Sequence, residues 1–182
     1  AKNMIKAGYS LIVYDIVGSS VEELATEGAS AGSSAREVAE QVSVVITMVP
    51  DSADSEAAIL GSNGVLEGLS PGATVIDMSS IAPAVSQKIA SACEGQGVAF
   101  LDAPVSGGEP KAIDGTLAVM VGGKEEVFNQ HKDLLEVMGS SVVLCGNYGA
   151  GNITKIANQI IVAANIEAVG EALVLAKKAG LD

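Results

Sequence analysis

The feature that most constrains the fold is an alternation of short apolar runs, rich in β-branched residues, with longer polar segments that favour helix. Such runs are typical of strands that are covered on both faces. Strands joined by helical crossovers form a parallel sheet. The strands are expected at residues 11–15, 42–49, 74–78, 98–101, 117–121 and 142–145. The sequence therefore predicts an α/β fold, Rossmann-like and doubly wound, with a mostly parallel sheet.

The start of the chain predicts a sheet that lacks its first strand. Residues 2–7 resemble the end of a helix, and Gly8 follows as its C-terminal stop, directly before the strand expected at 11–15. In the strand order 3-2-1-4-5-6, the missing strand would lie at the centre of the sheet, beside the strand at 42–49. We therefore expect a gap in the sheet. The glycine-rich turn that holds the cofactor phosphates should also lie outside the chain.

A single long helix is predicted from Gly151 to about Ala179, because apolar residues recur there at helical spacing and no proline interrupts them. At 1.5 Å per residue the helix would be roughly 40 Å long, which is more than a small sheet needs. It is therefore expected to lead into an all-α domain. The expected domains are a nucleotide-binding domain at 1–150 and, at 151–182, the start of an interdomain helix and of the helical domain.

Charge and composition disfavour several classes of function. The chain carries 22 acidic and 10 basic side chains, a net charge of -12 at pH 7, which would repel nucleic acid and anionic membranes. Cys93 and Cys145 lie far apart and outside any zinc-binding spacing, so no metal site is predicted. No uninterrupted apolar run approaches the roughly 20 residues of a membrane helix. We expect a cytoplasmic protein, and we expect its one histidine, His131, at the surface.

Three loops that follow strands are candidates for binding a nucleotide, because open α/β sheets bind ligands at the carboxyl ends of their strands. Asp15 ends the first strand, where an acid can bond the ribose hydroxyls, and no cation follows that could hold a 2′-phosphate. NAD is therefore favoured, and NADP stays open. Met48, Val49 and Pro50 end the second strand, and Ser79 follows the third. A simple turn at Asp15 and helix capping by Ser79 or Ser80 are the competing interpretations.

Two glycine-rich segments carry the candidate substrate site. In the stretch Ser106, Gly107 and Gly108, backbone amides could approach a small carboxylate closely, because glycine has no side chain. Lys155 and Asn158 follow the second segment on one side of the long helix, near its start. A partly desolvated lysine in the field of a helix N-terminus would have a lowered pKa and could donate a proton to a carbonyl oxygen. The alternatives are a plain turn and a solvated lysine.

Three strings carry a resemblance to a known family: IDMSSIAP at 76–83, DAPVSGGEPKAIDGTLAVMVGG at 102–123 and GAGNITKIANQ at 149–159. In this order and spacing they resemble the β-hydroxyacid dehydrogenase family, to which 3-hydroxyisobutyrate dehydrogenase belongs. The resemblance covers the whole chain. It implies hydride transfer between a nicotinamide cofactor and a small 3-hydroxy acid or its semialdehyde, in an enzyme that forms homo-oligomers.

The resemblance also implies roles for the candidate residues. These are Lys155 as the catalytic lysine; Ser106, Gly107 and Gly108 as the substrate-carboxylate loop; Asn158 as a substrate contact; Ser79 beside the nicotinamide; and Met48, Val49 and Pro50 as the cofactor loop. Because the phosphate-binding turn and the helical domain lie outside the chain, we expect the chain alone to bind NAD weakly and to be inactive.

Two other interpretations stay open at this point. A non-catalytic nucleotide-binding module would share the fold, although it would have no need of a proton donor beside the carboxylate loop. A dehydrogenase of the 6-phosphogluconate type would need cations for the substrate phosphate, and only Lys111 lies near the loop.

Overall fold

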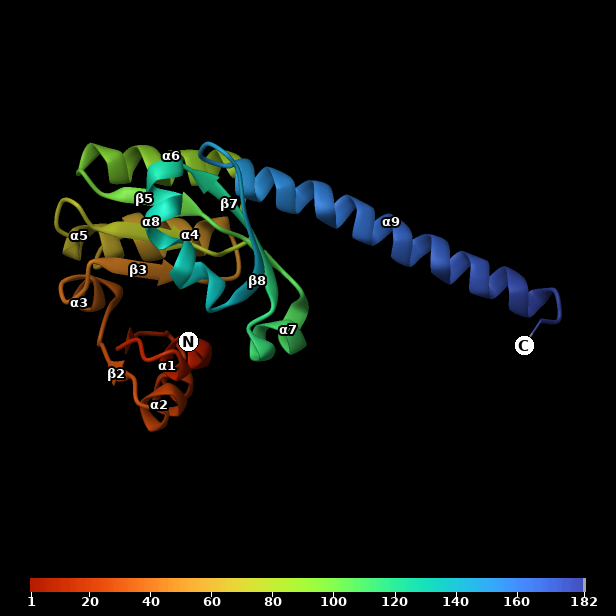
Figure 1. Ribbon diagram of the computed structural model, residues 1–182, viewed down its shortest axis with the longest axis horizontal. Coiled ribbons are helices and arrows are strands. Elements are labelled where there is room, and N and C mark those ends of the chain that lie inside the picture. The colour runs from red at the N-terminus through yellow and green to blue at the C-terminus, as the bar shows by residue number, and fades with distance from the viewer. Residues whose placement is uncertain (182) are drawn as a thin grey trace.

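The computed structural model describes residues 1–181 and consists of an α/β unit from which one long helix projects (Figure 1). In chain order the elements are α1 (Lys2–Lys6), β1 (Ile12–Val13), α2 (Gly18–Thr26), β2 (Ser30–Ala31), α3 (Ala35–Ala39), β3 (Val44–Thr47), α4 (Ser52–Leu60), α5 (Val65–Gly68), β4 (Thr74–Asp77), α6 (Pro83–Gly95), β5 (Ala99–Asp102), β6 (Val105–Ser106), α7 (Gly108–Asp114), β7 (Leu117–Gly123), α8 (Glu125–Glu136), β8 (Gly139–Gly146) and α9 (Ala150–Lys178).

The strands form two sheets. β1 and β2 pair in parallel as a small sheet. In the main sheet, β3, β4 and β5 pair in parallel, and β8 pairs in parallel with β7. β7 runs antiparallel to β5 and β6. Among the described residues, neither β1 nor β2 pairs with β3, so the sheet is interrupted where the sequence predicts a gap. The mostly parallel α/β fold is confirmed.

The six predicted strands are all present, and two further strands were not predicted. β2 and β6 have two residues each, which is too short for a pattern of apolar residues to reveal. β7 is antiparallel to β5 because a parallel crossover usually needs a helix that spans the sheet. The connection between them, residues 103–116, instead contains β6 and the seven-residue α7.

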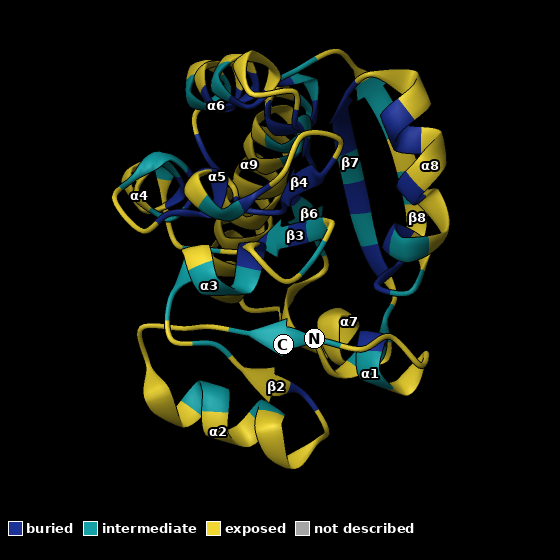
Figure 2. Ribbon diagram, turned by 90° about the vertical axis from the view of Figure 1, so that its left-hand side faces the viewer, coloured by how far each residue is buried: buried dark blue, intermediate teal, exposed yellow. Residues whose placement is uncertain are grey.

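Two apolar cores lie on the opposite faces of the main sheet, as neighbouring residues of a strand point to opposite sides. Phe100 contributes to the core beneath α4, α5 and α6. Leu101, the next residue, contributes to the core beneath α8. Figure 2 shows β4 and β7 as largely buried and the outer sides of α6 and α8 as exposed. The main sheet is therefore a rigid base for the loops that leave its edge.

His131 lies in the second of these cores, so its expected place at the surface is wrong. The side chain is 7% exposed, and its Nε2 lies 3.0 Å from Thr74 Oγ1 in a hydrogen bond. The polar neighbours of His131 in the sequence were misleading. The residues four positions away on either side, Val127 and Leu135, are buried apolar residues of the same helix face.

We expect the free energy of unfolding to fall as the pH is lowered through the range in which histidine titrates. Burial lowers the pKa of His131 from its ordinary value of 6.5, so the unfolded chain takes up a proton at higher pH than the folded chain. The contribution to stability is complete above pH 6.5 and is lost as the pH falls toward the lower pKa of the folded state.

Urea unfolding at several pH values between 8 and 5 measures this loss. The matched variant is His131→Gln, which keeps polar atoms near Thr74 but cannot titrate, and its stability should depend less on pH over the same range. The same pH dependence in both proteins would assign the effect to other groups.

α9 confirms the predicted long helix, and most of its surface is exposed. Its buried residues are Gly151 and Asn152, close to its start. An 18-residue window has a mean hydropathy of 1.6, so α9 is long and apolar enough to cross a membrane by length and composition alone. The expectation that no segment would qualify is corrected. Residues such as Asn158 and Glu167 interrupt each apolar run, while the average hydropathy stays high.

Candidate active site

The candidate site lies at the carboxyl edge of the main sheet, where three parallel strands end together. Thr47, Asp77 and Asp102 are partners in the register of β3, β4 and β5, and all three are buried. The segments that follow these residues therefore leave the sheet side by side. They carry the candidate cofactor loop at 48–50, the turn at 78–82 and the candidate carboxylate loop at 106–108.

Ser79 forms a hydrogen bond with the candidate cofactor loop and fixes its position. Its side chain is fully buried, and its Oγ accepts a hydrogen bond from the backbone N–H of Val49 at 2.9 Å. Asp77 Oδ1 in turn accepts hydrogen bonds from Thr47 Oγ1 at 3.0 Å and from the Ser79 N–H at 3.1 Å. The competing interpretation of Ser79 as a helix cap does not hold, because the N-cap of α6 is Ala82.

Asp15 forms the tight turn that was its competing interpretation. Its Oδ1 accepts a hydrogen bond from the Val17 N–H at 2.8 Å. The residue is exposed, and within residues 1–181 its second carboxylate oxygen has no hydrogen-bond partner. Asp15 follows the small sheet, and no hydrogen bond joins it to the other candidate residues in the described part of the chain. One oxygen therefore shapes the turn while the other is open to a ligand.

Two buried residues to which the sequence alone assigned no role, Asp102 and Asn152, hold the start of α9. Asp102 Oδ1 accepts a hydrogen bond from the Gly149 N–H at 2.7 Å, and its Oδ2 accepts one from the Asn152 N–H at 3.0 Å. Asn152 Oδ1 accepts from the Ile81 N–H at 3.0 Å, and its Nδ2 donates to Ser86 Oγ at 3.1 Å. The available signal was an aspartate at the end of a buried strand, together with glycine at a helix start.

The charge of Asp102 is held in an apolar setting by backbone donors. Burial raises the pKa of its carboxyl, and hydrogen bonds from the N–H groups of Asn152, Gly149 and Gly151 act in the opposite direction. The first amides of α9 are thus occupied by a carboxylate of the chain itself. They are not free to bind the anion of a substrate.

Lys155 lies about one turn, and Asn158 nearly two turns, further along α9 than Asn152. Asn158 Nδ2 lies 3.5 Å from Ser106 Oγ, so the structure brings the helix and the candidate carboxylate loop together. Lys155 is partly buried, and desolvation lowers the pKa of its ammonium group from the ordinary 10.5. The field of the helix start, which the sequence predicts to contribute to this lowering, is offset by the Asp102 carboxylate. Partial burial is therefore the cause.

A groove of about 760 Å³ follows the start of α9 and exposes Lys155 to a ligand. Its lining residues come from the loop before α4, the turn before α6 and one side of α9: Asp51, Ser52, Ser80, Ile81, Ala82, Asn152, Lys155, Ile156, Gln159, Ile160 and Ala163. Ser106 and Asn158 do not line it. Because Asn158 lies three residues after Lys155 on the helix, Lys155 stands between the groove and the Ser106 contact.

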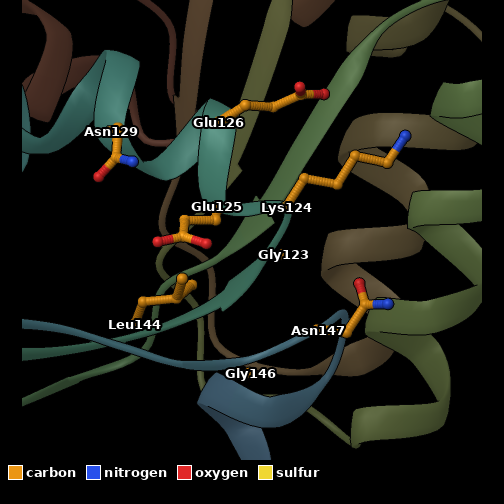
Figure 3. Close-up of a pocket in the computed structure, with 8 residues that line it drawn as sticks. All are labelled: Gly123, Lys124, Glu125, Glu126, Asn129, Leu144, Gly146 and Asn147. Carbon is orange, nitrogen blue, oxygen red and sulfur yellow. The ribbon is translucent and has the colours of Figure 1, made fainter.

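A second hollow, of about 730 Å³, lies at the start of α8 and contains none of the candidate residues (Figure 3). Glu125 and Glu126 contribute carboxylates to its lining. Its one lysine, Lys124, is paired with Glu94 of α6, with 2.7 Å between Nζ and Oε1. This hollow therefore offers no free cation for an acidic substrate, and the groove beside Lys155 is the better candidate.

Comparison with known proteins matches both parts of the chain to NAD-binding families. Residues 1–146 match the family model described as the NAD binding domain of 6-phosphogluconate dehydrogenase. Residues 149–182 match the model described as NAD-binding of NADP-dependent 3-hydroxyisobutyrate dehydrogenase. The chain belongs to the β-hydroxyacid dehydrogenase family. Both descriptions agree with the cofactor class expected from the sequence, NAD with NADP open.

Two curated members of the β-hydroxyacid dehydrogenase family match all 182 residues. The chain is 46% identical to 2-hydroxy-3-oxopropionate reductase of Escherichia coli (strain K12) and spans 62% of that protein. It is 42% identical to the mitochondrial 3-hydroxyisobutyrate dehydrogenase of Mus musculus and spans 54% of that protein. The chain thus covers less than two thirds of either relative. Since one of these relatives is mitochondrial, a cytoplasmic location stays a prediction.

A solved structure of the family confirms the fold. Mycobacterium tuberculosis 3-hydroxyisobutyrate dehydrogenase with L-serine has a TM-score of 0.94 and is 34% identical, and the match covers the whole chain and 61% of that structure.

Proposed function

We propose that the protein carrying this chain is a nicotinamide-dependent oxidoreductase that reduces 2-hydroxy-3-oxopropionate, which is tartronate semialdehyde, to glycerate. The observation that carries the proposal is Lys155. It is partly buried, desolvation lowers its pKa, and no carboxylate of residues 1–181 pairs with it. The Asn158–Ser106 contact lies beside it. The 46% identity to a reductase of this substrate supports the choice of compound.

In this proposal the chain supplies binding, orientation and a proton. Ser106 Oγ and the backbone N–H groups of Gly107 and Gly108 hold the substrate carboxylate. Both glycines are exposed and have positive φ angles of 144° and 68°, which residues with a side chain rarely adopt. Asn158 orients the loop and the substrate through Ser106. Lys155 Nζ donates its proton to the carbonyl oxygen, which becomes the hydroxyl of the product.

The nicotinamide, when bound, supplies the hydride to the carbonyl carbon. The residues proposed to hold the cofactor are Asp15 at the ribose, the loop Met48, Val49 and Pro50, and Ser79 beneath that loop. The open oxygen of Asp15 and the hydrogen bond that fixes the loop support these roles. The proposed domains are the nucleotide-binding unit at 1–150 and, from 151, the entry to a helical domain that would cover the apolar side of α9 in a homo-oligomer.

We expect the protein to prefer NADH to NADPH. The carboxylate of Asp15 would repel the 2′-phosphate of NADPH. Asp15→Asn should therefore reduce the ratio of kcat/KM with NADH to kcat/KM with NADPH by roughly tenfold. The exposed acid Asp133 of α8 provides the matched control, because Asp133→Asn removes the same charge from an element that carries none of the proposed cofactor residues. An unchanged ratio in Asp15→Asn would remove Asp15 from the cofactor site.

The test of the proposed reaction is steady-state oxidation of NADH by the full-length protein. The substrates are tartronate semialdehyde, methylmalonate semialdehyde, glyoxylate and succinic semialdehyde. The highest kcat/KM is expected with tartronate semialdehyde. A preference for methylmalonate semialdehyde would favour a 3-hydroxyisobutyrate dehydrogenase, which the 42% identity to the mouse enzyme supports as the second candidate. If the protein reduces none of the four compounds, a non-catalytic nucleotide-binding module would be favoured.

A further inference from the structure

α9 lacks a capping side chain of its own. Its N-cap residue is Gly149, at φ 86°, and no side chain near the helix start caps it from the same segment. The first backbone N–H groups of a helix have no partner within the helix, and leaving them unpaired is unfavourable. A side chain from elsewhere in the fold has to supply that partner.

Asp102 supplies this cap from the end of β5, about fifty positions earlier in the chain. Its two oxygens accept hydrogen bonds from Gly149, the N-cap, and from Asn152, the third residue of the helix. The fit is close. A Cβ atom added to Gly151 would come within 2.9 Å of Asp102 Oδ2, so the helix backbone lies directly against the carboxylate.

The rest of α9 has little else to hold it. From Gln159 to Lys178 every residue except Ala176 is exposed, and Figure 1 shows the helix projecting away from the sheets. The direction of α9, and with it the place of Lys155, is therefore set by the attachment of its first turns.

The same residue also lies shortly before the candidate carboxylate loop. Asp102 is the last residue of β5, and the chain reaches Ser106 four residues later. The two halves of the proposed substrate site, the loop at 106–108 and the helix with Lys155, thus meet at a single buried carboxylate. A shift of either half relative to the other would separate the proton donor from the carbonyl oxygen that it has to reach.

We infer that Asp102 is a positioning residue that holds Lys155 in register with the carboxylate loop by anchoring the first turn of α9. The inference rests on the proposed function for its effect on turnover. Its effect on Lys155 itself can be observed without any turnover.

The direct test is trace acylation of the lysines with acetic anhydride across a range of pH, read by mass spectrometry in the full-length protein. Lys177, exposed in the last turn of α9, is the internal reference. In the wild type, Lys155 should titrate below the ordinary lysine value of 10.5. In Asp102→Asn the anchored turn loosens and Lys155 becomes hydrated, so its midpoint should rise toward the ordinary 10.5, although removal of the Asp102 charge alone would lower it. A midpoint that stays in place or falls further would overturn the inference.

Asp77→Asn is the matched control, because Asp77 is the buried aspartate at the neighbouring strand end and has no hydrogen bond to α9. It should leave the Lys155 midpoint unchanged. The same shift in both variants would indicate general loosening of the sheet edge and would also overturn the inference.

Turnover provides the second measurement. Misplacement of the proton donor should lower kcat by roughly 100-fold in Asp102→Asn. In a Lys155→Ala background the same substitution should change kcat by less than about twofold, since the ammonium group that Asp102 positions is absent. Equal losses in both backgrounds would indicate a structural role only. A protein without any reductase activity would contradict the proposed function, while the acylation result would still decide on Asp102.

A third measurement needs no variant, so it decides the matter even if Asp102→Asn fails to fold. In the wild-type protein, hydrogen exchange should find the amides of Gly149 and Asn152 protected as strongly as amides inside α9. Exchange at the rate of unbonded amides would mean that the anchor does not persist in solution, and the inference would fail.

Discussion

Lys155→Ala is expected to lower kcat for semialdehyde reduction by about 10²- to 10⁴-fold, the usual contribution of a positioned general acid. Lys155 is partly buried beside the groove, and desolvation lowers the pKa of its ammonium group, so that it gives up a proton more readily than a surface lysine. Binding of NADH, measured by its fluorescence, should persist because the proposed cofactor residues lie on other elements. Steady-state kinetics and the binding titration together separate the two effects.

The control for this substitution is Lys177→Ala, which removes a lysine from the exposed last turn of the same helix and should leave kcat unchanged. If Lys155→Ala turned over as fast as the wild type, another group would have to donate the proton. The pH dependence gives a further check. Activity that requires protonated Lys155 should decline as the pH rises through its lowered pKa, and this decline should be absent from the residual rate of the alanine variant.

Phe100→Ala is expected to lower the free energy of unfolding by about 3 to 5 kcal/mol, the usual cost of removing a buried phenylalanine. Phe100 is fully buried in the core beneath α6. Its ring also lies 6.3 Å from the ring of Tyr148, at an interplanar angle of 55°, an arrangement that adds to the loss. Urea unfolding at neutral pH, outside the range in which His131 titrates, measures the change.

Phe100→Leu is the matched variant, since it keeps an apolar side chain of nearly the same volume and should cost less than about 1.5 kcal/mol. Tyr14→Ala, at a side chain that is 43% exposed, should change stability by less than about 0.5 kcal/mol. Equal stability of Phe100→Ala and Phe100→Leu would mean that this core tolerates a cavity that its packing does not suggest.

Local patterns were sufficient for the elements whose residues act within their own segment. The apolar runs that form β4 and β5 are buried on both faces, and β3 is buried on one face and partly buried on the other, so their apolar residues alone identified these strands. Gly8 ends α1 with a φ of 89°, a conformation that glycine adopts without strain. The length of α9 followed from helical spacing over nearly thirty residues.

The contacts that were missed join residues far apart in the chain. Asp102 caps a helix about fifty positions away, and Asn152 binds Ile81 and Ser86 on two further segments. No local spacing contains such a pairing. His131 was misplaced for the same reason, since its partner Thr74 lies on a strand 57 positions earlier. The Ser106–Asn158 contact could be expected only from the family resemblance, because their separation of 52 positions carries no local signal.

The attachment of α9 by one end gives the helix the mechanics of a lever. With 29 residues it is about 44 Å long at 1.5 Å per residue. A tilt of about 10° at the first turn would move the far end by roughly 8 Å, while Lys155, near the pivot, would move by little more than 1 Å. A small displacement of α9 at the substrate site would therefore appear as a large displacement at its distal turns. A partner packed against those turns could hold Lys155 in place with a small force.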